Sequence, residues 1–505
     1  MKKQHFIKIF SILGLICLVA FLMLYFADDS FARPGGGHGH HGGYSRGSGG
    51  YRGSYSGGYG GGVFILGDSW WIWLIIIVVY YVIKSIASKD EQETISSAPT
   101  TKNITTSSSD INSKLAQLIE IDPNFSKPIF LDFVSVLFTK FHYYAGEGQV
   151  QKLTPFFEGD LQNWEKYTIS ELSIASVRIS DVELHQDGFN SILVTIDADY
   201  TTNMRPQYGS KSIRRSTKQN WLFARPENAV SVQPQGFGVL RCPNCGAPAN
   251  FTDSGQCLSC GSEVSHNAGQ WVVKGVKVLR MEGFNSQDML DYAEEYGTDL
   301  PTIKSAQLKS LAGVFSQQHP DLISVSDQQN YVYAGFIKTI AEPYFLEIYQ
   351  NWSDGTWNNV RHLVSDRQWQ SMDLYMQGYN RLGYKNVLEN VKILRCDAAD
   401  YFLDNNYESI TIRIFAQCLD YVVDKSGKKL AGNNRTPRVF SEYWTFVCKK
   451  GIKAKTSEFK KCPCCGAPAD NMGQGGLCGY CGSKITDANF SWVLFSITQD
   501  EEYRG

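Results

Sequence analysis

Eight of the thirteen cysteines fall into two tight groups of four. Each group consists of two C-x-x-C pairs separated by eleven or twelve residues, a spacing at which four thiolates can converge on one tetrahedral metal ion. Zinc suits four thiolates best, and four protein ligands leave no position for water, so the sequence predicts two structural Zn²⁺ sites. The predicted ligands are Cys242, Cys245, Cys257 and Cys260 in the first site and Cys462, Cys465, Cys478 and Cys481 in the second.

Features around the cysteines bear on this interpretation. A redox role is the alternative for a C-x-x-C pair, but two pairs within one site favour a metal. Gly246, Gly261, Gly466 and Gly482 follow the pairs, and we expect them to supply tight turns with positive φ. Cys464 is an additional thiol inside the second group and could compete as a ligand.

The two cysteine groups belong to a longer duplication. The motif C-P-x-C-G-A-P-A at 242–249 recurs at 462–469, and C-x-x-C-G-S at 257–262 recurs at 478–483. Three further pairs of markers keep nearly the same separation: Asp199-Tyr200 with Asp420-Tyr421, Trp221-x-Phe223 with Trp444-x-Phe446, and Trp271-Val272 with Trp492-Val493. Because all these marker pairs have nearly the same sequence separation, the sequence predicts that one structural unit occurs twice.

Each repeat is expected to contain helices followed by strands. Ser126 and Pro128 indicate a helix start, and apolar residues then recur at three- or four-residue steps from Phe130 to Tyr144. Alternating apolar residues at 192–200 and 410–418 predict half-buried strands. This order predicts an α+β fold in which helices cover one face of a curved antiparallel sheet.

The N-terminal part has a different character. In residues 1–34, three lysines precede an apolar run and a small-residue cleavage pattern follows it. This order predicts a signal peptide or a signal anchor. Residues 35–62 are glycine-rich and are expected to be a flexible spacer, in which we give His38, His40 and His41 no role. Residues 63–84 are apolar with tryptophans and tyrosines at the ends, which predicts a transmembrane helix.

The orientation in the membrane follows from the flanking charges. Lys84 and Lys89 follow the predicted transmembrane helix, so the positive-inside rule places the rest of the chain in the cytoplasm, at the cell membrane. A reducing cytoplasm also suits two groups of free thiols. Arg33, Arg46 and Arg52 lie on the other side of the helix and favour the opposite orientation, so both topologies stay open.

Length and composition limit the remaining organisation. The 505 residues exceed what one hydrophobic core usually fills, so several domains are expected. Because 43% of the residues are apolar, a wholly disordered chain is excluded. The net charge of -2 creates no electrostatic field that would attract a polyanion. Beyond a polar linker at 85–109, the expected segments are a first domain at 110–235, a first zinc ribbon and following strand at 240–283, a helical connector at 284–323, a second domain at 324–456, and a second zinc ribbon and strand at 460–505.

Short strings in both repeats resemble a known domain family. The strings I-D-P-N-F at 121–125 and L-T-P at 153–155, with V-S-D at 364–366 and F-S-E-Y-W-T-F at 440–446 in the second repeat, are similar to those of the Tim-forty-four-like domain family. The resemblance covers about 109–225 and 324–447. It implies two cone-shaped domains like that of nuclear transport factor two, each with helices on a strongly bent antiparallel sheet around a hydrophobic pocket.

The resemblance also implies a function. Mitochondrial members resemble peripheral scaffolds that tether a chaperone motor to a preprotein channel and contact acidic lipid, whereas bacterial relatives with a membrane segment and a glycine-rich stretch resemble this chain more closely. No chaperone-recruiting segment is recognisable in this sequence. We therefore expect a membrane-anchored, non-enzymatic binding or scaffold protein in protein transport or membrane-protein assembly, with membrane lipid, polypeptide clients and translocation machinery as partners.

A pocket function is the first alternative. Asp197, Asp199 and Asp420 are the nearest candidates for a carboxylate base or a ligand-binding group in a cone, although a solvated strand face is the simpler interpretation of the first two. The sequence contains no Ser/His/Asp order, no phosphate-binding glycine loop and no open metal site. It therefore assigns no catalytic residue and favours a protein that is not an enzyme.

Nucleic-acid binding through the ribbons is the second alternative. Two basic clusters could contact phosphates, but they could equally face anionic lipid headgroups, which a tethered protein meets first. The sequence therefore favours lipid over nucleic acid, and it does not determine the oligomeric state. The clusters are Lys211, Arg214 and Arg215, and Lys449, Lys450, Lys453, Lys455, Lys460 and Lys461.

Overall fold

The computed structural model describes residues 108–233, 236–242, 245, 247–252, 256–262, 270–284, 298–322, 332–453, 461–468 and 475–505. The predicted signal segment, glycine-rich spacer and transmembrane helix lie outside the described residues, as do residues 285–297 and 323 of the predicted connector. In the described part of the chain, no helix is long and apolar enough to cross a bilayer.

The first repeat combines helices with one four-stranded antiparallel sheet. Its helical elements are α3 (Ser108–Ile121), α4 (Lys127–Glu147) and the 3₁₀ helices η1 (Val150–Phe156) and η2 (Pro206–Tyr208). Its strands are β1 (Tyr167–Gln186), β2 (Phe189–Met204), β3 (Ser212–Pro226) and β4 (Val272–Phe284), and they lie in the order β1-β2-β3-β4.

The second repeat has the same plan with additional helices. Its helical elements are α5 (Gln307–Ser310), α6 (Ala312–Gln318), η3 (Pro320–Leu322), α7 (Ala334–Phe336), the π-helix η4 (Ile337–Ala341), α8 (Glu342–Asp354), η5 (Trp357–Leu363) and α9 (Asp366–Leu382). Its strands are β5 (Lys385–Leu403), β6 (Tyr407–Val423), β7 (Lys429–Lys449) and β8 (Val493–Gln499), in the order β5-β6-β7-β8. The predicted α+β class with antiparallel sheets is confirmed.

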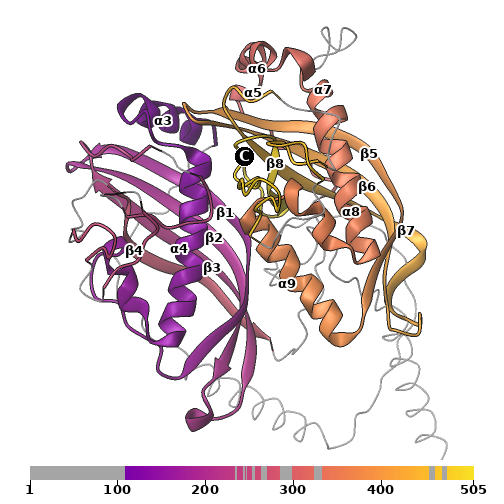
Figure 1. Ribbon diagram of the computed structural model, residues 1–505, viewed down its shortest axis with the longest axis horizontal. Coiled ribbons are helices and arrows are strands. Elements are labelled where there is room, and N and C mark those ends of the chain that lie inside the picture. Colours follow the sequence, from indigo (N-terminus) through magenta and orange to yellow (C-terminus); the bar gives the residue numbers. More distant parts are fainter. Residues whose placement is uncertain are drawn as a thin grey trace, which may run out of the picture. The chain divides into compact units, whose positions relative to one another are not determined.

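The helix predicted at Ser126 and Pro128 is α4. Ser126 is its N-cap, Pro128 lies in its first turn, and Gly148 ends it in the left-handed region with a φ of 78°. Its apolar face packs on β3, where the rings of Phe130 and Phe223 lie 5.4 Å apart. Figure 1 shows α4 crossing the sheet, so this helix covers the inner face of the first repeat.

The corresponding helix of the second repeat is continuous but irregular. It runs through α7, η4 and α8 and, like α4, ends at a left-handed glycine, Gly355, with a φ of 73°. Pro343 lies just beyond the π-helical turn and has no N–H to donate to the carbonyl four residues earlier. A π-helical turn directly before a proline lets the helix continue past the missing hydrogen bond.

Both sheets are bent at matching places. Glu171 in β1 and Asn390 in β5 have left-handed φ values of 54° and 53°, and each lies inside a shift of the strand register. Two further register shifts occur in the same phase in both strands, and β1 has one more near its end, between Glu183 and Gln186. Bulges increase the local twist and bend a strand, so the two sheets curve alike.

The strands predicted to be half-buried are buried on both faces. In β2, Ile196 faces the core while Asp197 on the opposite face is 0% exposed, and in β6 the outward Arg413 is 1% exposed. The prediction of half-buried strands is wrong because alternation reports only which face is apolar. Here the outer, polar faces are covered by protein.

The strand after each cysteine group completes the sheet of its own repeat. β4 pairs with β3 and β8 pairs with β7, so each group is inserted between the third and fourth strands. Matching parallel bridges, Phe157 to Val273 and Val364 to Leu494, fasten the fourth strands to the ends of η1 and η5. The cysteine groups are therefore held at both ends by their sheets.

The two repeats share an apolar seam and a helix cap. Phe237, which precedes the first cysteine group, packs against Tyr407 and Phe495 of the second repeat, with ring centroids 5.1 and 5.7 Å away. The backbone N–H of Lys127 donates to Asp404 Oδ2 over 3.2 Å. A carboxylate of the second repeat thus satisfies an N–H at the start of α4.

Candidate metal centres and the polar site between the repeats

The four thiols of the first predicted site converge. All four Sγ atoms lie within 4.8 Å of one another, with Cys242 to Cys260 and Cys245 to Cys257 each 4.0 Å apart. Four thiolates at a Zn–S distance of about 2.3 Å would lie about 3.8 Å apart, so this spacing fits a tetrahedral ion. Cys242 and Cys257 are buried, whereas Cys245 and Cys260 are exposed, which places the group at the surface.

The second group repeats this geometry. Cys462 lies 3.9 Å from Cys481, and Cys465 lies 3.9 Å from Cys478. Cys464 is outside the quartet, where its Sγ accepts a hydrogen bond from Ser483 over 3.3 Å. The structure therefore groups the four predicted ligands without the additional thiol.

Left-handed glycines close the thiol-bearing turns. Gly261, Gly466 and Gly482 have φ values of 71°, 76° and 71°, as the sequence predicted. The N–H of each donates to the carbonyl of the first cysteine of its pair, over 2.8 Å in all three cases. Gly246 lies outside the described residues. These turns hold the thiols of a C-x-x-C pair on one side of the backbone.

Asp366 joins the second cysteine group to the rest of its repeat. It begins α9 and accepts hydrogen bonds from Arg361, from Lys484 and, over 2.9 Å, from Thr486 Oγ1. Burial opposes ionisation of this carboxyl, but Arg361 and Lys484 hold its pKa below the usual value. Asp366 is part of the V-S-D string, so one residue of the resemblance fastens the cysteine group to α9.

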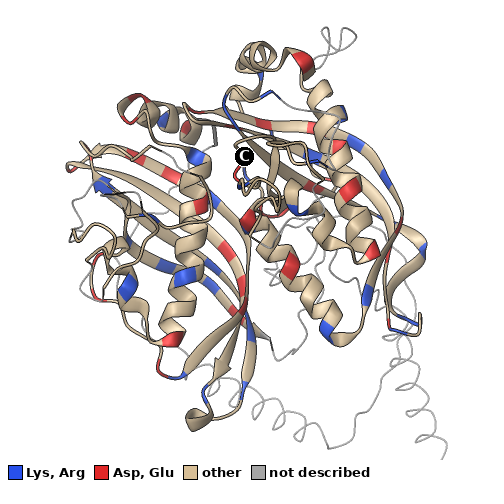
Figure 2. Ribbon diagram, in the orientation of Figure 1, with Lys and Arg blue, Asp and Glu red and all other residues tan. Residues whose placement is uncertain are grey.

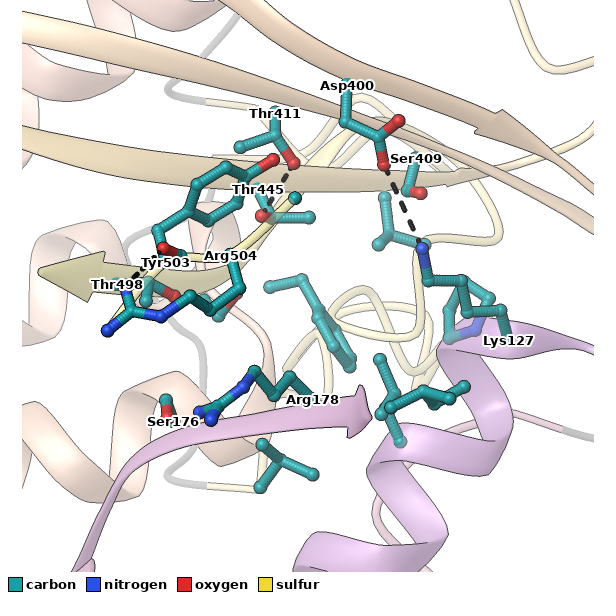
Figure 3. Close-up of a pocket in the computed structure, with 18 of the residues that line it drawn as sticks. Lys127, Ser176, Arg178, Asp400, Ser409, Thr411, Thr445, Thr498, Tyr503 and Arg504 are labelled. Carbon is teal, nitrogen blue, oxygen red and sulfur yellow. Dashed lines mark hydrogen bonds and ion pairs between the residues drawn. The ribbon is translucent and has the colours of Figure 1, made fainter. Parts of the chain in front are cut away.

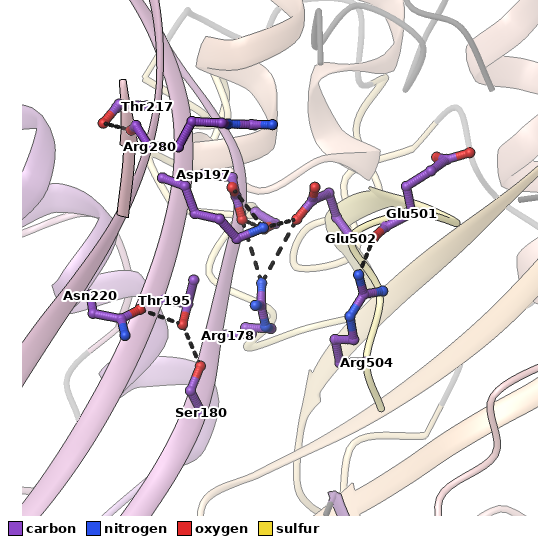
Figure 4. Close-up of polar contacts among 12 residues, drawn as sticks. Arg178, Ser180, Thr195, Asp197, Thr217, Asn220, Arg280, Glu501, Glu502 and Arg504 are labelled. Carbon is purple, nitrogen blue, oxygen red and sulfur yellow. Dashed lines mark hydrogen bonds and ion pairs between the residues drawn. The ribbon is translucent and has the colours of Figure 1, made fainter. Parts of the chain in front are cut away.

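Asp197 lies between the repeats rather than in a pocket under α4. Its carboxylate accepts from Ser176 Oγ over 3.1 Å and lies 3.4 Å from Arg178 and 3.2 Å from Lys218. Figure 4 shows Arg178 and Glu502 converging on it from two sides. The interpretation of a solvated face is wrong for Asp197, because the second repeat covers this side of the sheet.

Asp199 and Asp420 occupy different faces of their sheets. Asp199 is 4% exposed on the outer face of β2, where burial and this carboxylate raise the pKa of Tyr375 of α9. Asp420 lies on the inner face and accepts from Asn386 Nδ2 over 2.8 Å, and Asn386 in turn accepts from Trp352. The three aspartates are therefore not brought together into one site.

The strand register corrects one marker of the duplication. Val194 pairs with Trp221 in the first sheet, and Ile412 pairs with Trp444 in the second. Counting from these pairs, the counterpart of Asp199 is Gln417 and not Asp420. The recurrence of Asp-Tyr is thus a coincidence, whereas the tryptophan and cysteine markers are structurally equivalent.

A cavity of about 100 Å³ adjoins this polar site. Hydroxyl groups line it from both repeats, among them Ser176 of β1 and Thr411 and Thr445 of the second sheet. The labelled side chains of Figure 3, including Lys127 and Tyr503, surround this space. The cavity is small, apolar side chains such as Val177 and Phe495 line it beside the hydroxyl groups, and it lies between the repeats rather than beneath the helices.

The predicted basic clusters differ in exposure. Arg214 is 9% exposed and pairs with Glu171 at 3.9 Å, so the first cluster is partly used inside the fold. Lys449, Lys450 and Lys453 are exposed at the end of β7, whereas 454–460 lie outside the described residues. Figure 2 shows basic and acidic residues interspersed over both repeats.

These features define a tandem α+β protein with a tetracysteine group inserted before the last strand of each sheet. Residues 326–460 match the family model of the Tim44-like domain, which is the Tim-forty-four-like family that the sequence resembles. The resemblance is confirmed for the second repeat, which carries a Tim44-like domain. No curated protein matches the chain.

Sequence reasoning missed the contribution of the last residues. The strand predicted after the second zinc ribbon is β8 (Val493–Gln499). The following residues reach the first repeat, where Glu502 Oε2 lies 2.9 Å from Lys218. The sequence signal for this contact is the short acidic stretch Asp500-Glu501-Glu502, and such stretches are usually solvent-exposed.

Proposed function

We propose that this chain is a membrane-anchored, non-enzymatic scaffold that binds polypeptides in protein transport or membrane-protein assembly. The observation that carries the proposal is the Tim44-like domain at 326–460. That family is generally non-enzymatic and suggests a scaffold or transport role. The membrane anchor is the predicted helix at 63–84.

The interiors of the repeats are compatible with this proposal. The space between α4 and its sheet is packed with aromatic rings, including Phe138, Trp221 and Phe223, all 0% exposed. The equivalent region of the second repeat holds Phe345 and Trp444, also 0% exposed. Cores packed in this way favour binding on outer surfaces over chemistry in a pocket.

We further propose that both repeats are cone-shaped domains of one family and that each cysteine group holds a structural Zn²⁺. The matched bulges, the equivalent helices and the insertion before the fourth strand support the first point. The sulfur spacing and the closed set of four thiols support the second. A structural ion would hold the ribbon in shape and would supply no reaction chemistry.

Membrane lipid is the second proposed partner. Lys449, Lys450 and Lys453 are exposed at the end of β7, and a basic patch gains about 1 kcal/mol per charge near an anionic surface. The proposed location is the cytoplasmic side of the cell membrane. Binding to liposomes with and without anionic lipid tests this part separately from polypeptide binding.

Photo-crosslinking in intact membranes tests the scaffold proposal. A photoreactive residue is placed at Leu394 or Val439, which are each 51% exposed on the second sheet. We expect captured partners to include translocation machinery or nascent membrane proteins, identified by mass spectrometry. Tyr208, 49% exposed on the first repeat, provides a matched control position, and the paired change Cys462→Ser and Cys465→Ser tests dependence on the second ribbon.

The outcomes separate the candidate functions. Capture of polypeptides at the second sheet, reduced at the control position, supports the scaffold. Capture of lipid or small molecules alone contradicts it and favours a pocket function.

A further inference from the structure

The residues after β8 form an acidic segment, Asp500–Gly505, that contacts both repeats. Glu502 is 7% exposed and Asp500 is 6% exposed, although both are charged. The N–H groups of Glu502 and Tyr503 donate to the carbonyl of Gln499 over 3.1 and 3.0 Å, which turns the segment toward the first repeat. The acidic segment is therefore docked, with its carboxylates facing protein.

At the first repeat, Glu502 completes a charge balance. Arg178 and Lys218 both lie against Asp197, and one carboxylate cannot neutralise two cations. Glu502 Oε2 lies 2.9 Å from Lys218 and 3.8 Å from Arg178, so these two cations share two carboxylates. Without the segment, Asp197 alone would face both cations in this partly buried site, and burial makes an unmatched charge costly.

At the second repeat, the same arrangement recurs with Asp500. The guanidinium of Arg413, 1% exposed, lies 3.0 Å from Asp500, which also accepts a hydrogen bond from Ser441. Tyr503 stacks on Tyr443 with ring centroids 3.8 Å apart and an interplanar angle of 9°. The segment thus provides an anion to each repeat and an aromatic ring that stacks on the second repeat.

The acidic segment leaves an empty cavity beside it. The cavity of about 100 Å³ lies beside it and is lined by Glu502, Tyr503 and Arg504 together with Ser176 and Thr411. Cationic groups on both repeats, a ring to stack on and this adjoining cavity can accommodate another peptide of the same chemistry whose side chains differ in size.

We propose that the surface beneath Asp500–Gly505 is a binding site for acidic, tyrosine-containing peptides, and that this segment is a resident ligand that a client peptide displaces. The proposal rests on the scaffold function proposed above and names the chemistry of its client. It places the client site at the junction of the repeats, on Arg178, Lys218, Arg413 and Tyr443. Displacement of the segment would couple client binding to the contact between the repeats.

The test uses the full chain and a version that lacks residues 500–505. The probe is a fluorescent peptide with the sequence of residues 499–505, and binding is measured by fluorescence anisotropy. We expect the shortened chain to bind the probe at least about tenfold more tightly than the full chain, because its site is vacant. Lys218→Ala in the shortened chain should weaken binding about tenfold, whereas Lys277→Ala, an exposed lysine on β4, should not.

Several results would overturn the proposal. One is a shortened chain that keeps its helix content and metal yet binds the probe no more tightly than the full chain. Another is a scrambled peptide that binds as tightly as the probe, because this would show that the site attracts negative charge without recognising a sequence. If the shortened chain does not fold, Glu502→Gln in the full chain replaces it. We expect tighter probe binding by that variant, and unchanged binding counts against the proposal.

Failure of the peptide-site proposal can be distinguished from failure of the scaffold proposal. If the second sheet captures polypeptides in membranes but the shortened chain binds no acidic peptide, only the site and its client chemistry are wrong. If neither experiment captures a polypeptide, the scaffold proposal itself fails.

Discussion

His142 lies on α4 inside an aromatic cluster. Its ring centroid is 4.1 Å from that of Phe138, 5.0 Å from Tyr200 and 5.6 Å from Trp164, and its Nδ1–H donates to the Phe138 carbonyl over 2.8 Å. Burial lowers the pKa of His142 to about 4. The imidazole is therefore neutral in the folded protein at neutral pH.

This histidine should make the first repeat sensitive to acid. Its pKa is lower in the folded chain than the unfolded value of about 6.5, so its stabilisation is present above pH 6.5 and is lost as pH falls toward 4. Between pH 7 and pH 5 the loss should be about 2 kcal/mol. We expect His142→Phe to remove this part of the pH dependence of the urea midpoint, and His185→Asn, at an exposed histidine, is the control substitution.

The thiols permit a second prediction at this scale. Replacing Cys242 and Cys245 by serine should reduce bound zinc from two ions per chain to one, because a ribbon that loses two thiolates cannot close its coordination sphere. The first repeat should also loosen, since β4 follows the ribbon and completes its sheet. Metal content measured by mass spectrometry checks this, and a Cys464→Ser variant should keep both ions. Unchanged zinc would contradict the ribbon assignment.

At the scale of elements, the helix composed of α7, η4 and α8 packs unusually closely on η3. A Cβ added at Gly335 would lie 1.2 Å from the carbonyl oxygen of Leu322, which no side chain tolerates. This contact explains why a residue with poor helix propensity lies inside a buried helix. The neighbouring α6 has Gly313, where a Cβ would meet nothing within 4 Å.

The two glycines should therefore respond oppositely to alanine. Gly335→Ala should destabilise the second repeat by about 1–3 kcal/mol, because α7 and η3 must separate. Gly313→Ala should stabilise it by about 0.5–1 kcal/mol through helix propensity alone. Thermal unfolding of both variants checks the prediction. A neutral Gly335→Ala would show that the helix can shift without loss.

At the scale of the whole molecule, polar contacts fasten the inserted and terminal parts to the sheets. Asp366 is the anchor of the second cysteine group through Lys484 and Thr486. We expect Asp366→Asn to speed zinc release from the second site severalfold, because the loss of charge weakens two ion pairs. Release to a chromogenic chelator measures this, and the first site serves as an internal control. Equal release from both sites would contradict a local anchor.

Much of the local structure was predictable from the sequence. The start of α4 was predicted from Ser126 and Pro128, the strands from alternation, and the thiol turns from glycines that adjoin the C-x-x-C pairs. These signals succeed because caps, pleats and tight turns depend on residues a few positions apart. The Tim44-like resemblance in the second repeat was recognisable for a related reason, since its motifs are short and contiguous.

The environment of the polar strand faces was decided only by tertiary structure. A strand face carrying Ser176, Arg178 and Asp197 has the same pattern whether water or protein covers it, and only the second repeat made it an interface. The same holds for Asp199 and Asp420, whose faces depend on a register that bulges shift. The chain by itself thus determined the repeats and the thiol groups. Packing between distant segments determined which polar residues meet, because no local pattern records what lies across an interface.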